Sequence, residues 1–133
     1  MIDAAPVLAL KPAARAFDAA AAGFDARFGA WLSVAAQRRA VRSTLARAFP
    51  PGSRLLEIGG GTGEDALWLT QRGCEVLVTD PSPAMVRIAT AKLAPHRAPA
   101  PIELAAEDLE RLADARESAG ESPLDGAFSN FAA

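Results

Sequence analysis

The stretch LLEIGGGTGEDALWL, residues 55–69, decides how this chain folds. An apolar run leads into it, and it holds four of the ten glycines of the chain. The run RLLEI (54–58) predicts a short buried strand. EDALWLTQRG (64–73) predicts a helix with acids in its first turn and Gly73 at its end. A glycine loop between such elements is typical of a turn that lets a ligand approach the backbone.

The same alternation of strands and helices continues on both sides of this stretch. Residues 13–48 are rich in alanine and arginine, lack proline and predict one or two helices, which FPPGS (49–53) ends. The remaining predicted elements, in chain order, are a strand CEVLVTD (74–80), a helix in PSPAMVRIATAKLA (81–94) with Ser82 as its N-cap, a strand IELAA (102–106), a segment EDLERLADARESAG (107–120) that begins as a helix and then turns polar and loop-like, and a fourth strand that begins LDGAFSNFAA (124–133).

This order predicts an α/β fold, a Rossmann-like doubly wound parallel sheet with helices on both faces. Ligands of such sheets bind beyond the carboxyl ends of the strands. The glycine loop, Asp80, the segment 105–108 and the pair Ser129 and Asn130 are all expected to meet there. We expect a helical lead-in over residues 1–48 and a cofactor-binding domain over residues 49–133.

Composition excludes several functions. The chain has 133 residues, a net charge of −2 and 50% hydrophobic residues, which fits one globular domain with no electrostatic footprint for nucleic acid. Cys74 has no partner for an internal disulfide and is interpreted as a small apolar residue; His96 lies in a proline-rich loop, so no metal site is expected. The N-terminus does not have the pattern of a signal peptide, because Asp3 replaces the expected positive charge and Pro6 and Pro12 interrupt the short apolar stretch. No window reaches the roughly 18 apolar residues that a membrane span needs. A cytoplasmic location is therefore expected.

Three templates compete for the glycine loop. A phosphate-binding P-loop needs Lys followed by Ser or Thr after its last glycine, and Glu64 and Asp65 stand in those places. The dinucleotide fingerprint G-x-G-x-x-G begins at Gly59 and Gly61, but its third glycine position falls on Glu64. The spacing present over residues 57–63 is E-x-G-x-G-x-G.

Charge also disfavours a phosphate ligand. Each carboxylate in the first helical turn opposes a pyrophosphate by roughly 1 kcal/mol or more at an effective dielectric constant near 20. S-adenosylmethionine meets no such penalty, because it has no phosphate and carries a sulfonium and an ammonium group.

The chain resembles the class I S-adenosylmethionine-dependent methyltransferases, and among them the small-molecule enzymes of types 11 and 25. The resemblance covers roughly residues 50–133. The segments that carry it are EIGGGTG (57–63), which is similar to motif I of the family, VLVTDPSPAMVRIA (76–89), EDLERL (107–112) and LDGAFSNFAA (124–133), with a weaker likeness in the lead-in segment AFDAAAAGFDARF (16–28).

The resemblance implies a binding site for the methionine part of S-adenosylmethionine at the loop. Glu57 would orient the loop or meet the ammonium group of the cofactor, directly or through water. A Cβ on the glycines would collide with the cofactor. The loop residues implied as cofactor-binding are Gly59, Gly60, Gly61, Thr62 and Gly63.

The resemblance implies further contacts along the edge of the sheet. Asp80, which ends the second predicted strand, would accept both ribose hydroxyls, and Pro81 would pack against the adenine. Asp108 would accept the adenine amino group while the backbone of Leu109 meets a ring nitrogen. A register three residues earlier puts Ala105 in the place of Asp108, and we prefer Asp108 because that register supplies an acid.

Ser129 and Asn130 would face the methyl group and the acceptor. No general base is identified. The sequence reads SNFAA where family members that act on amides and amines usually carry (N/D)-P-P-(Y/F), which favours a small-molecule acceptor over nucleic acid. The alternative to a methyltransferase is a non-catalytic S-adenosylmethionine-binding module, or a split subunit that needs a partner chain to complete its sheet.

The family has more strands than the four readable here, so we expect a form truncated after the fourth strand. We also expect a partner chain over the exposed edge of that strand.

Overall fold

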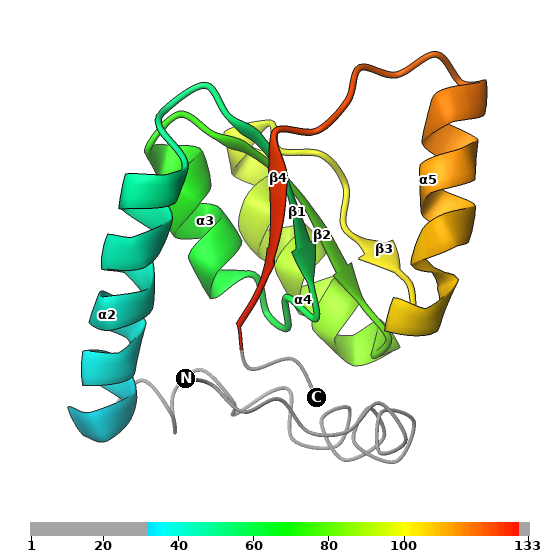
Figure 1. Cartoon of the computed structure of the whole chain (residues 1–133). Coiled ribbons are helices and arrows are strands. Elements are labelled where there is room, and N and C mark those ends of the chain that lie inside the picture. Colours follow the sequence, from blue (N-terminus) through cyan, green and yellow to red (C-terminus); the bar gives the residue numbers. More distant parts are fainter. Residues whose placement is uncertain (1–31, 131–133) are drawn as a thin grey trace.

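The computed structural model describes residues 32–130 (Figure 1). The predicted helical lead-in before residue 32, including AFDAAAAGFDARF (16–28), and the last three residues of LDGAFSNFAA lie outside the described residues. The described elements are α2 (Leu32–Ala48), β1 (Arg54–Ile58), α3 (Glu64–Gln71), β2 (Glu75–Asp80), α4 (Pro83–Leu93), the 3-10 turn η2 (Ala94–His96), β3 (Ile102–Glu103), the 3-10 turn η3 (Ala106–Asp108), α5 (Leu109–Ser118) and β4 (Gly126–Ser129).

The four described strands form one parallel sheet in the order β3-β2-β1-β4. The chain crosses from β1 to β2 to β3 in one direction and then returns past β1 to add β4. Because such crossovers are right-handed, the return places α5 on the face opposite to α3 and α4. Figure 1 shows α5 standing apart from α3 and α4. The predicted Rossmann-like α/β fold is confirmed.

The core fills the face of the sheet that α3 and α4 cover. Inward-facing residues of β1 and β2 pack there against the apolar faces of the amphipathic helices. Cys74 is buried in this cluster, which confirms its interpretation as a small apolar residue. The buried members are Leu45, Leu55, Ala66, Leu69, Cys74, Val76, Val78 and Leu93.

Helix α2 joins this core through its last turns and through α3. Leu45 is buried in the cluster, and the Arg42 guanidinium lies 5.5 Å from the ring centroid of Trp68 in α3. The helix ends before FPPGS, as predicted. Whether the chain divides into two units at residue 48 stays a prediction. Within residues 32–130, no helix has both the length and the apolar character that a membrane crossing requires.

The third strand is shorter than the predicted IELAA. β3 has two residues and pairs only with β2, where Ile102 lies opposite Thr79 and Glu103 opposite Asp80. Pro101 lacks a backbone N–H and precedes the strand, and η3 turns the chain from Ala106 onward, so the ladder has little room to extend. The helix that follows is longer than its polar composition suggested, and its end is held by an ion pair between Arg116 and Glu121.

Candidate functional site

The glycine loop connects β1 to α3 at the carboxyl edge of the sheet. Gly59, Gly61 and Gly63 have φ values of 68°, 60° and 85°, a backbone region that residues with a Cβ rarely adopt. The Gly60 N–H donates to the Thr79 carbonyl oxygen at 2.9 Å, which ties the loop to the end of β2. The alternating glycines are therefore needed for the shape of the loop.

The space around the glycines differs along the loop. A Cβ on Gly60 would lie 2.5 Å from Val78 Cγ1 and 3.0 Å from Glu57 Oε1, so this position is closed by the protein itself. A Cβ on Gly63 would lie 3.3 Å from the Cβ of Ala89 in α4, which makes Gly63 a packing residue. A Cβ on Gly61 would meet no described atom within 4 Å. Of these three glycines, Gly61 is the one whose open side a ligand could approach.

The carboxylate of Asp80 clamps this loop from the end of β2. Its Oδ2 accepts the Gly61 N–H at 2.9 Å, and its Oδ1 accepts the Ser82 N–H at 2.9 Å. Ser82 in turn caps α4, because its hydroxyl oxygen accepts the Met85 N–H at 3.2 Å. The predicted N-cap is thus confirmed. These two contacts hold the Asp80 carboxylate beside the open position of the loop.

Glu57 is the most unusual group at this edge. It ends the buried part of β1 with only 2% of its surface exposed, and its Oε1 has no hydrogen-bond partner among the described residues. Burial, followed by the nearby charges of Asp65 and Asp80, raises the pKa of Glu57 well above its usual value of 4.5. A buried carboxylate with an unsatisfied oxygen is costly, and a cation would relieve that cost.

Asp65, in the first turn of α3, connects three elements at this edge. Its Oδ2 accepts from Asn130 Nδ2 at 2.7 Å, at the end of β4, and its Oδ1 accepts from Arg42 Nε of α2 at 3.4 Å. Asp65 and Asn130 are each 7% exposed. Asn130 Oδ1 is buried and lacks a hydrogen-bond partner among the described residues.

Its neighbour Glu64 points to other partners. The Glu64 carboxylate pairs with Arg38 of α2 at 3.6 Å and with Lys92 of α4. Lys92 also donates to the hydroxyl of Thr62, which is 4% exposed. The two acids that follow the glycine loop therefore have different surroundings. Glu64 pairs with side chains of α2 and α4, whereas Asp65 binds Asn130 and lies near the buried Glu57.

The segment after β3 lies beside Asp80, because the Leu104 N–H donates to the Asp80 carbonyl oxygen at 3.0 Å. Ala105 immediately precedes η3, and the Asp108 N–H donates back to its carbonyl oxygen at 2.9 Å. The Asp108 side chain is 40% exposed and pairs with Arg111 at 3.6 Å. Leu109 begins α5. The segment thus reaches the predicted edge, with Asp108 turned at least partly to solvent.

At the end of β4, the two candidate residues differ in their contacts. The Ser129 hydroxyl donates to the Ile58 carbonyl oxygen at 3.0 Å and the residue is exposed, whereas Asn130 is buried against Asp65. Pro81, between Asp80 and Ser82, is half-buried. No group of three or more His, Cys, Asp or Glu side chains arranged to hold a metal occurs within residues 32–130.

Comparison with known proteins identifies the family. A sequence-family model described as a methyltransferase domain matches residues 34–128. The chain belongs to this family. Among curated proteins, the search finds no significant match.

Several solved structures are similar to part of this methyltransferase domain. A TehB-like SAM-dependent methyltransferase from Corynebacterium glutamicum is 27% identical, with a TM-score of 0.39, over 41% of this chain and 29% of that one. A SAM-dependent methyltransferase from Geobacter sulfurreducens in complex with S-adenosyl-L-homocysteine is 28% identical, with a TM-score of 0.36, over 41% and 23%. One from Thiobacillus denitrificans, in the same kind of complex, is 26% identical, with a TM-score of 0.36, over 41% and 23%. The matched region spans under a third of each of these proteins.

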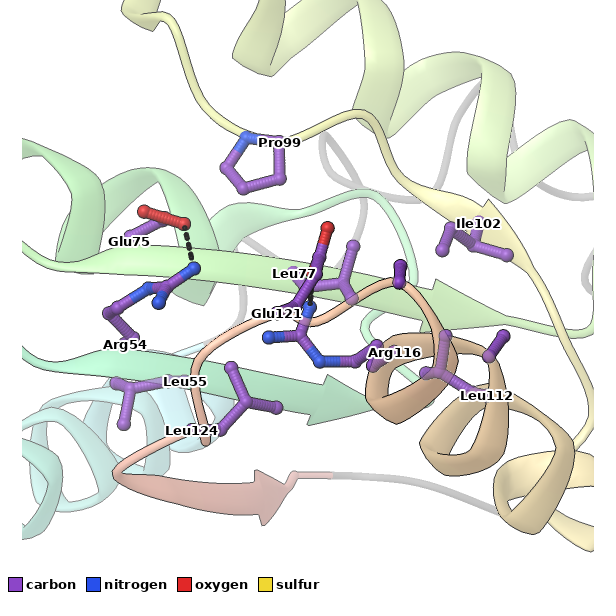
Figure 2. Close-up of a pocket in the computed structure, with 12 residues that line it drawn as sticks. Arg54, Leu55, Glu75, Leu77, Pro99, Ile102, Leu112, Arg116, Glu121 and Leu124 are labelled. Carbon is purple, nitrogen blue, oxygen red and sulfur yellow. Dashed lines mark hydrogen bonds and ion pairs between the residues drawn. The ribbon is translucent and has the colours of Figure 1, made fainter.

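A cavity of about 360 Å³ lies elsewhere in the methyltransferase domain, between α5 and the sheet (Figure 2). Arg54 and Glu75, which begin β1 and β2, line it, so it is at the amino edge of the strands, opposite to the glycine loop. Figure 2 shows an ion pair between these two residues. Because α5 buries none of its residues completely, we attribute the cavity to the loose cover that this helix gives the second face.

The predicted site residues do gather along the carboxyl edge. Sequence reasoning treated Asp65 only as a charge that repels phosphate and missed its contact with Asn130. The signal was present, since an acid in the first turn of a helix after a glycine loop lies next to the strand ends. Its partner, however, is 65 positions away along the chain, and no local pattern shows such a pairing.

Proposed function

We propose that this methyltransferase domain binds S-adenosylmethionine at the carboxyl edge of its sheet and transfers the methyl group to a small-molecule acceptor. The observation that carries the proposal is the buried Glu57 carboxylate, whose Oε1 lacks a partner among the described residues beside Asp65 and Asp80. Three acids at a glycine loop favour a ligand with positive charge and without phosphate. S-adenosylmethionine has both properties.

The residues fit the methionine part of this cofactor. Glu57 would accept a hydrogen bond from its ammonium group. The open side of Gly61 offers room for a close approach to the backbone, and the loop residues Gly59, Gly60, Gly61, Thr62 and Gly63 would border it. The contacts of Gly60 and Gly63 with the protein support a role for these two in shaping the loop.

The adenosine part would lie toward β2 and β3. Asp80, whose carboxylate lies beside the backbone of Gly61, would accept the ribose hydroxyls. Pro81 would pack against the adenine, and Asp108 with the Leu109 backbone would meet its polar edge. The ion pair of Asp108 with Arg111 competes with that role, so the earlier register at Ala105 stays an alternative.

Bound S-adenosylmethionine supplies an activated methyl group, so the protein has to bind, align and exclude water. Ser129 and Asn130 would stand where the acceptor approaches. A base is needed only for an acceptor that must lose a proton, and no described residue is assigned that role. The second candidate is a non-catalytic binding module or a split subunit with a partner chain along β4, whose described pairing is with β1 alone.

Turnover separates the two candidates. The protein would be incubated with S-adenosylmethionine and a pool of small metabolites, and formation of S-adenosylhomocysteine would be measured against Asp80→Ala as a control. Acceptor-dependent product in the native chain, reduced in the variant, supports the enzyme. Cofactor binding without product in any pool supports the binding module. If S-adenosylmethionine does not bind at all, both proposals fail.

A further inference from the structure

Two buried oxygen atoms at the carboxyl edge lack hydrogen-bond partners among the described residues. One is Glu57 Oε1 and the other is Asn130 Oδ1. Both residues are more than nine-tenths buried, at 2% and 7% exposure. Such groups are rarely left unsatisfied in proteins, so each indicates a donor that arrives from outside the described chain.

Asp65 decides which end of the Asn130 amide carries the unsatisfied atom. An ionised carboxylate only accepts hydrogen bonds, so the amide must turn its Nδ2 toward Asp65, at 2.7 Å. Oδ1 is then directed elsewhere and becomes an acceptor. Arg42 of α2 supplies a cation beside the other carboxylate oxygen.

Asp65 also lies near Glu57, because burial and then the charge of Asp65 raise the pKa of that carboxyl. Glu57 lies opposite Phe128 in β4, two residues before Asn130. The two unsatisfied oxygens are thus linked through one buried side chain. A primary ammonium has three donors and can satisfy two acceptors at once.

We propose that Asp65 is a positioning residue for ammonium recognition: it orients the Asn130 amide so that Oδ1 joins Glu57 as an acceptor for the ammonium group of the cofactor. This inference rests on the proposed function and deepens it. Asp65 itself does not touch the cofactor. The selectivity for the amino-acid part of the ligand depends on it.

Two ligands isolate this effect. S-adenosylhomocysteine carries the ammonium group, and 5′-methylthioadenosine shares its adenosine and sulfur but lacks the amino-acid part. Calorimetric titration of both gives an affinity ratio that reports recognition of the amino-acid part, which carries the ammonium group. We expect Asp65→Asn to lower the affinity for S-adenosylhomocysteine about tenfold, the scale of one charge-assisted hydrogen bond, and to leave 5′-methylthioadenosine unchanged.

The matched control is Glu64→Gln, which removes one negative charge at the adjacent position but acts on Arg38 and Lys92. It should leave the ratio unchanged. A double-mutant cycle tests the route, because Asp65→Asn should have no further effect on the ratio in an Asn130→Ala background.

The outcomes decide between readings. Equal loss of both ligands in Asp65→Asn means that the role is structural, and an equal fall in the ratio for Glu64→Gln means a general charge effect; either result overturns the inference. Additive effects of Asp65→Asn and Asn130→Ala overturn it as well. If the unmodified chain binds neither ligand, the proposed function itself fails. Retained 5′-methylthioadenosine binding shows that each variant is folded.

Discussion

Replacement of Glu57 by glutamine tests the interpretation of the buried carboxylate. The raised pKa means that the folded chain keeps a proton that the unfolded chain releases, from the usual value of 4.5 upward. In this pH range the native state binds more protons, so the free energy of unfolding falls as pH rises. One proton corresponds to a slope of about 1.4 kcal/mol per pH unit until the raised pKa is reached.

Glu57→Gln has no proton to lose at this position. We therefore expect the variant without ligand to be more stable than the native chain, by an amount that grows with pH across this range. Urea unfolding at several pH values from 5 to 8 measures the difference, and contributions from the other titrating groups cancel between the two proteins. Parallel curves, with the same pH slope for both, would refute the reasoning.

Binding should respond in the opposite sense. The variant loses the charge that meets the ammonium group, and we expect an affinity for S-adenosylhomocysteine at least about tenfold lower. Higher stability together with weaker binding separates this account from a general loss of structure, which would lower both.

Three further substitutions have defined outcomes. Asp80→Ala should weaken S-adenosylhomocysteine binding in calorimetry, and an unchanged affinity would count against the ribose assignment. Gly60→Ala places a methyl group 2.5 Å from Val78 Cγ1, so it should lower the urea midpoint and disturb the loop. Gly126→Ala places a methyl group 2.5 Å from Phe49 Cε1, far from the loop; it should lower stability by about 1–3 kcal/mol and leave the affinity of the folded fraction unchanged, and weaker binding after correction for unfolding would contradict this.

The fold was predictable because its signals are local. The strand RLLEI, the loop and the helix that follows each have a pattern of their own, and Ser82 marks the start of α4 by its chemistry. Alternation of such elements leaves few topologies. The length of the third strand was overestimated, because composition does not show that the strand ends at Glu103 and that η3 then turns the chain.

The site was predictable in its position and only partly in its contacts. Spacing placed the loop and Asp80 at the same edge, but the different surroundings of Glu64 and Asp65 depend on which helix packs beside each. The buried oxygens of Glu57 and Asn130 that lack hydrogen-bond partners among the described residues are consequences of burial and of long-range pairing. Sequence patterns describe neighbours along the chain, so such contacts escape them.

The central claim is that the glycine loop serves a cationic ligand without phosphate. The most direct measurement is calorimetric titration of the chain with S-adenosylhomocysteine and, separately, with NAD under the same conditions. The account predicts saturable binding of S-adenosylhomocysteine and none of NAD. Binding of NAD without binding of S-adenosylhomocysteine would contradict it.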